Sequence, residues 1–106
     1  MRVLLDECLP RGLKKHLRNH EVKTVPEAGW AGKKNGELLR VAAGDIDVFI
    51  MIDSNLVYQQ KVGVLPFGVV VLAARSNRLG DLLPLVSDIL AALSSVGPGQ
   101  VLRIGG

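Results

Sequence analysis

Two short apolar segments of this chain each lead directly into acidic residues. Residues 2–5 (Arg-Val-Leu-Leu) are followed by Asp6 and Glu7, and residues 48–52 (Val-Phe-Ile-Met-Ile) are followed by Asp53. Apolar strands without polar alternation are typical of a parallel sheet that is covered on both faces. Ligands of open α/β sheets bind outside the carboxyl ends of the strands. We therefore expect both acidic groups at one edge of one sheet.

The rest of the chain alternates between apolar strands and amphipathic helices. Further strands are expected at residues 21–25, 68–73 and 100–104, and helices are expected to begin near Pro10, Asn35 and Asp81. At 106 residues with 48% hydrophobic content, the chain is large enough for one core but not for two. Strand–helix alternation with right-handed crossovers predicts a single α/β domain over residues 1–106, a three-layer sandwich with a mostly parallel central sheet.

The position of each carboxylate relative to the strands separates the candidate site residues from the others. Asp6 and Asp53 follow strands, and Glu37 lies in the first turn of a helix that returns from the same edge. Asp45 and Asp47 precede a strand, so we expect them at the opposite edge. The further candidates at the first edge are Glu7, Asn55 and Asp81.

Carboxylates gathered at one edge repel one another unless a cation lies among them, and oxygen ligands favour hard divalent cations. We therefore expect Asp6, Glu37 and Asp53 to hold Mg²⁺ or Mn²⁺. At a phosphate-cleaving site such a metal ion polarises the phosphoryl oxygen and activates water.

Several motifs spread over nearly the whole chain carry a resemblance. They are Leu4-Leu5-Asp6-Glu7 with Leu9-Pro10, Ala28-Gly29-Trp30, Gly36-Glu37-Leu38-Leu39, residues 47–55 and residues 76–85. Together they resemble the small PIN-like family of toxin-like proteins. The resemblance implies a PIN-like fold, a metal-dependent ribonuclease and a toxin that pairs with a small antitoxin protein. It assigns Asp6 as the first metal ligand, Glu37 as the helix acid and Asp53 as the strand-end acid.

One position departs from the pattern of that family. Its members usually have a threonine two residues before the strand-end aspartate, where this chain has Met51. A threonine hydroxyl can orient a carboxylate or a water molecule, and a thioether cannot. The departure bears on activity rather than on the fold.

Basic residues are concentrated in the first part of the chain, since ten of the 13 lysines and arginines lie at or before Lys61. Regular spacing places several of them on the outer face of the first helix, where they can contact the phosphates of an RNA substrate. Trp30 can stack on a base. The residues predicted to bind RNA are Arg11, Lys14, Lys15, Arg18, Trp30 and Lys33.

The cellular setting follows from what the chain lacks. No apolar run approaches the roughly 20 residues that span a bilayer, and residues 1–6 become acidic too early for a signal peptide. A single cysteine, Cys8, provides neither a disulfide framework nor a zinc motif. We expect a cytoplasmic protein with no membrane partner, and a homodimer is left open.

Two other functions fit the same residues. One is a degenerate PIN-like module that binds RNA or a partner protein without cleaving. The other is a receiver-like domain, which also places an acidic pair after its first strand and a phosphate-accepting aspartate after its third. Against the receiver reading, no serine or threonine directly ends the strand at residues 68–73, and no Lys-Pro pair follows a later strand.

Overall fold

A computed structural model describes residues 1–17, 19–33, 35–52, 63 and 65–105. Its centre is a sheet of five strands, all parallel: β1 (Arg2–Leu5), β2 (Glu21–Thr24), β3 (Val48–Met51), β4 (Gly68–Ala73) and β5 (Val101–Gly105). The strand order is β2-β1-β3-β4-β5. The expected α/β class is confirmed, and the sheet is wholly rather than mostly parallel.

One face of the sheet is covered by the 3₁₀ helix η1 (Arg11–His16), α3 (Leu79–Leu82), the short 3₁₀ helix η3 (Leu83–Leu85) and α4 (Val86–Ser95). Leu13 of η1 and Leu93 of α4 are fully buried against Leu5 and Ile50 of the strands. The side chains of Val3, Leu5, Val48 and Ile50 belong to this face, because alternate residues of a strand point to the same side.

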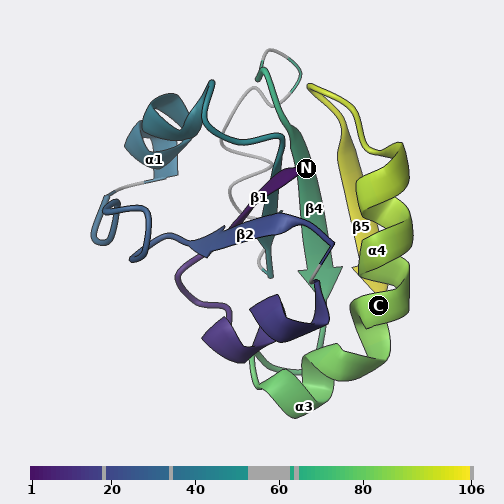
Figure 1. The fold of residues 1–106 in the computed structure, drawn as a ribbon. Helices are drawn as coiled ribbons and strands as arrows, with labels where there is room; N and C mark the ends of the chain where they lie inside the picture. Colours follow the sequence, from purple (N-terminus) through teal and green to yellow (C-terminus); the bar gives the residue numbers. More distant parts are fainter. Residues whose placement is uncertain (18, 34, 53–62, 64, 106) are drawn as a thin grey trace.

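The other face packs against α1 (Asn35–Ala42). Leu38 and Leu39 of α1 form a second apolar cluster with Leu4, Phe49 and Met51 of the strands. Figure 1 shows α1 and α4 on opposite sides of the sheet. The molecule therefore has three layers, in which β3 is buried throughout and β1 is buried from Val3 to Leu5.

Two helices differ from the sequence-based expectation. The segment after Pro10 forms a 3₁₀ helix instead of an α-helix; it is short, and Gly12 in its first turn lowers its helix propensity. The helix expected from Asp81 begins at Leu79 and is interrupted at Leu83–Leu85. Pro84 lies in that interruption, where its missing N–H removes one backbone hydrogen bond of a continuous α-helix.

The strand order creates a switch point between β1 and β3. The chain adds β2 on one side of β1, and then adds β3, β4 and β5 on the other side. In sheets of this order, the crevice for ligands lies outside the carboxyl ends of the two strands at the switch. Those are the two strands that Asp6 and Asp53 follow in the sequence.

Candidate functional site

Asp6 is held at the carboxyl end of β1 by the sheet itself. Its backbone N–H donates to the Ile50 carbonyl oxygen at 3.0 Å, which continues the pairing of β1 with β3 by one residue. The Leu9 N–H donates to the Asp6 carbonyl oxygen at 2.9 Å and closes a tight turn. The half-buried Asp6 side chain therefore starts from a fixed backbone.

The Asp6 carboxylate accepts two hydrogen bonds from its own turn. Its Oδ1 accepts from the Glu7 backbone N–H at 2.9 Å, and its Oδ2 accepts from the Cys8 thiol, with Sγ at 3.3 Å. Among the residues that the structure describes, no lysine, arginine or histidine forms a salt bridge with it. Each carboxylate oxygen accepts more than one bond, so Asp6 retains the capacity to bind a cation.

Cys8 stays protonated beside this carboxylate. Burial, followed by the negative charge of Asp6 and the hydrogen bond to Asp6, raises the pKa of its thiol to about 11. A hydrogen bond from the Ile52 backbone acts in the opposite direction. At neutral pH the thiol is therefore a donor to Asp6 and a poor nucleophile.

The ends of β1 and β3 lie side by side, and the Ile52 backbone is near enough to the Cys8 thiol to lower its pKa. Ile52 directly follows β3, and Asp53 is the next residue in the sequence. Asp53 and Asn55 lie outside the described residues. Among the described ones, the hydrogen bond from the Asp6 N–H to the Ile50 carbonyl oxygen joins the turn after β1 to the end of β3.

The loop after β4 joins the same edge. The Asn77 side-chain amide donates to the Cys8 carbonyl oxygen at 2.8 Å. In that loop the Ser76 hydroxyl donates to Asp81 Oδ2 at 2.6 Å and accepts from the Arg78 N–H at 3.1 Å. Asp81 thus lies at the expected edge, and its described contact holds the loop together.

The other acidic candidates are exposed. Glu7 follows Asp6 on the surface. Glu37, in the first turn of α1, forms a salt bridge with Lys33, with Nζ and Oε1 3.0 Å apart, and its side chain is 51% exposed. Within the described part of the chain, no three histidine, cysteine, aspartate or glutamate side chains form a group that could hold a metal ion.

Met51 is the last residue of β3, and its side chain is buried in the apolar cluster beneath α1, with 3% of it exposed. Its side chain points to the opposite face of the sheet from that of Ile50. The residue that replaces the threonine of the PIN-like pattern is thus a core residue in this fold.

The predicted RNA-binding residues do not form one free basic face. Lys14 is half-buried and donates to both carboxylate oxygens of Glu27 at 2.8 Å. That contact, together with the Thr24 N–H, lowers the pKa of Glu27 to about 2.

Arg11 and Lys15 are exposed, and Arg18 lies outside the described residues. Lys33 is paired with Glu37, as noted above, and the half-buried Trp30 packs against the core cluster beneath α1.

Two arginines after β4 were not among the candidates. Arg75 and Arg78 are exposed at the edge where Asp6 lies, and neither pairs with a carboxylate among the described residues. Arg11 approaches from η1, whose Gly12 lies against the Leu79 side chain of α3. We call Arg11, Arg75 and Arg78 the arginine group. Arg75 and Arg78 follow a parallel strand, as Asp6 does. The rule that the carboxyl ends of parallel strands lie at one edge of the sheet therefore also predicts that these arginines lie at the edge of Asp6.

Asp47 lies at the opposite edge, as expected, where it holds the start of β1. Its Oδ2 accepts from the Arg2 backbone N–H at 2.7 Å, and its Oδ1 lies 3.3 Å from a guanidinium nitrogen of Arg2. These bonds lower the pKa of Asp47, the backbone bond most. Asp45 lies two residues earlier, in the same loop before β3.

Comparison with known proteins gives no match, whether with protein-family models, with curated proteins or with solved structures. The resemblance to the PIN-like family therefore stays a prediction. Across the described residues, no helix is both long enough and apolar enough to cross a bilayer.

Proposed function

We propose that this chain is a metal-dependent ribonuclease whose site lies outside the carboxyl ends of β1 and β3. Asp6 and Asp53 would hold Mg²⁺ or Mn²⁺. The observation that carries the proposal is the pairing of β1 with β3, which the Asp6 N–H extends by donating to the Ile50 carbonyl oxygen at 3.0 Å, because it brings the end of β3, three residues before Asp53, beside the turn that bears Asp6. The motifs shared with the PIN-like family support the same assignment.

The chemistry of Asp6 fits a hard cation. Its carboxylate is half-buried, lacks a cationic partner among the described residues and is oriented by a backbone N–H. Oxygen ligands of this kind suit Mg²⁺ and Mn²⁺. When bound, the metal would polarise a phosphoryl oxygen and lower the pKa of a bound water molecule. Glu37 would join the site only by giving up its salt bridge with Lys33.

The arginine group would hold the substrate. Guanidinium groups bind phosphate through two parallel hydrogen bonds, which fixes orientation as well as charge. Arg75 and Arg78 lie on the loop that Asn77 ties to Cys8, so phosphates bound by them would lie near Asp6. RNA binding by this group should weaken as salt rises.

The wider setting rests on the resemblance. It supports a small antitoxin protein as the partner and the cytoplasm as the compartment. A homodimer is compatible with the proposal and is not needed for it.

The test is cleavage of single-stranded RNA by the purified chain with Mn²⁺, with Mg²⁺ and with a chelator. We expect metal-dependent cleavage that falls by at least about 100-fold in Asp6→Asn and in Asp53→Asn, because each removes a ligand charge. Asp88→Asn, an exposed acid in the first turn of α4, is the matched control and should keep full activity. Arg75→Ala with Arg78→Ala should weaken RNA binding while metal binding remains.

Two results would overturn parts of this proposal. Cleavage that survives Asp6→Asn would mean that the site lies elsewhere. Salt-sensitive RNA binding without cleavage of any RNA tried would identify the chain as a binding module that has lost catalysis.

A second candidate, a receiver-like phosphate acceptor, gains support from the strand order, because the order 2-1-3-4-5 is also that of receiver domains. Against it, β4 ends at Ala73, Ala74 follows, and the nearest hydroxyl, that of Ser76, is engaged by Asp81 and Arg78. Incubation with acetyl phosphate and Mg²⁺ separates the two functions. A phosphoryl group on Asp53, detected by mass spectrometry and absent in Asp53→Asn, would favour the receiver function.

A further inference from the structure

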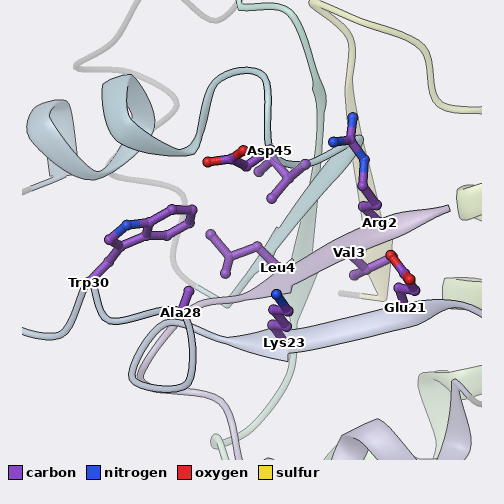
Figure 2. Close-up of a pocket in the computed structure, with 9 residues that line it drawn as sticks. Arg2, Val3, Leu4, Glu21, Lys23, Ala28, Trp30 and Asp45 are labelled. Atoms are coloured by element: carbon purple, nitrogen blue, oxygen red, sulfur yellow. The ribbon is translucent and has the colours of Figure 1, made fainter.

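A pocket lies on the face of β1 and β2 that α1 leaves uncovered. Its volume is about 420 Å³, within the range of small-molecule sites. In the register of these strands Arg2 pairs with Glu21 and Leu4 with Lys23, so these four side chains point to the same face. The loop containing Trp30 and the loop after α1 close the sides of the pocket (Figure 2).

The floor of the pocket is apolar and one wall is aromatic. Leu4 and Ile46 are 1% and 7% exposed and belong to the core. Trp30 is half-buried, and its backbone is fixed by a hydrogen bond from its N–H to the Val25 carbonyl oxygen at 3.1 Å. The side chain also packs against the apolar cluster beneath α1, which holds the indole in place, and Trp30 is the only tryptophan in the chain.

The charges around the pocket favour a cation. Arg2 is neutralised by its salt bridge with Asp47, and it also donates to the Gly44 carbonyl oxygen at 3.0 Å. Of the remaining charged groups, Lys23 carries one positive charge, and Glu21 and Asp45 carry two negative charges. None of the three has a side-chain partner among the described residues. Among the side chains that line the pocket, the balance is therefore one negative charge, on a chain whose formal net charge is +3.

Asp45 occupies an unfavourable position for a carboxylate. Its N–H donates to the Ala42 carbonyl oxygen at 2.9 Å, so it lies just beyond the carboxyl end of α1. The partial negative charge of a helix C-terminus disfavours an anion and favours a cation there. A cation bound beside Asp45 would be stabilised by both groups.

We infer that this pocket binds a small aliphatic cation with an ammonium or guanidinium head. Figure 2 shows the Asp45 carboxylate and the Trp30 indole toward the same end of the pocket, with the Leu4 side chain beside them. The cationic head pairs with the carboxylate and lies against the indole, which attracts cations through its π-electrons. The aliphatic stem covers Leu4 and Ile46. The pocket does not include Asp6, so it is separate from the proposed ribonuclease site.

The test uses the fluorescence of Trp30, excited selectively, as the reporter of its own pocket. We expect a saturable change with agmatine, which carries both head groups on a four-carbon stem, and a weaker one with butylamine. Adenosine monophosphate and inorganic phosphate should give no saturable change at the same concentrations. Calorimetric titration with agmatine provides a second readout.

Three variants complete the test. Asp45→Asn should weaken agmatine binding about two- to fivefold, because it removes the charged partner of the head group at an exposed position. Lys23→Gln should leave binding equal or tighter, since it removes a repelling charge. Asp88→Asn on α4 is the control and should bind like the original chain. Circular dichroism checks that each variant keeps its fold.

Three outcomes would overturn the inference. The first is no saturable binding of agmatine by either readout. The second is tighter binding of adenosine monophosphate than of agmatine, which would assign the pocket to nucleotides. The third is an Asp45→Asn variant, folded by circular dichroism, that binds agmatine as the original chain does.

Discussion

The two ends of β1 treat charge in opposite ways. At the amino end, the Asp47 carboxylate is matched by the guanidinium and backbone N–H of Arg2, and its pKa is lowered. At the carboxyl end, Asp6 accepts only from a backbone N–H and a thiol, with no cationic partner among the described residues. The four residues of β1 thus lie between Asp47, whose carboxylate stabilises the fold, and Asp6, whose carboxylate has no cationic partner among the described residues.

The largest effect is expected when the free energy of unfolding is measured with and without a divalent metal ion, which tests the difference between Asp6 and Asp47. We expect Mn²⁺ at ten times its dissociation constant to stabilise the chain by about 1.4 kcal/mol, which raises the melting temperature by about 6–11 °C for a domain of this size. Asp6→Asn should lose most of this shift, and Asp47→Asn should keep it. Differential scanning fluorimetry measures all three. Equal shifts in the two variants would show that the two ends do not differ in this way.

The reactivity of Cys8 gives a second comparison. Because Asp6 helps to raise the thiol pKa to about 11, Asp6→Asn should lower that pKa toward its ordinary value. Each unit of decrease raises the thiolate fraction at pH 8 about tenfold. Cys8 is the only cysteine, so the rate of alkylation by iodoacetamide reports on it alone.

Metal bound at Asp6 should raise the same rate in the original chain, because it offsets the negative charge. Asp47→Asn is the matched control and should alkylate at the original rate. A rate that is unchanged in Asp6→Asn would show that burial alone holds the thiol protonated.

The rule of strand polarity explains how much was predictable from the sequence. It needs only strand positions, and it correctly separated Asp6 from Asp47 before any packing was known. The partner of Lys14 could not be predicted. Helix periodicity places Lys14 on the outer face of its segment, but it does not show that the Glu27 side chain contacts that face in the fold. The pocket beside Trp30 was equally hidden, since it depends on strand register and on the area that α1 leaves uncovered.

Glu27 shows whether every carboxylate at the carboxyl edge of the sheet lacks a cationic partner, or whether this is particular to Asp6. Acid titration tests the difference. Glu27 follows β2 and is paired with Lys14, which lowers its pKa from 4.5 to about 2. A lowered pKa stabilises the fold above pH 4.5, and this contribution is lost as the pH falls toward 2. We expect Glu27→Gln to be less stable than the original chain at pH 7 and to converge with it near pH 2, measured by urea unfolding.

The smallest effect is expected at Asp47. Its lowered pKa also contributes stability above its ordinary value of about 3.8, and this is lost on acidification. Since its side chain is 42% exposed, Asp47→Asn should cost less than about 1 kcal/mol at pH 7. Urea unfolding at pH 7 and pH 3 measures the difference, which should shrink at the lower pH. A difference that grows at low pH would contradict the assigned pairing.

The hydrogen bond from the Asp6 N–H to Ile50 has a consequence for how a ligand binds. Because Asp6 extends the ladder between β1 and β3, its backbone conformational entropy is lost when the sheet forms. Ordering the backbone of one residue costs about 1–2 kcal/mol of conformational free energy. For Asp6 this free energy is already included in the folding of the chain. A cation that bound at Asp6 would therefore order only a side chain and not the backbone of this residue.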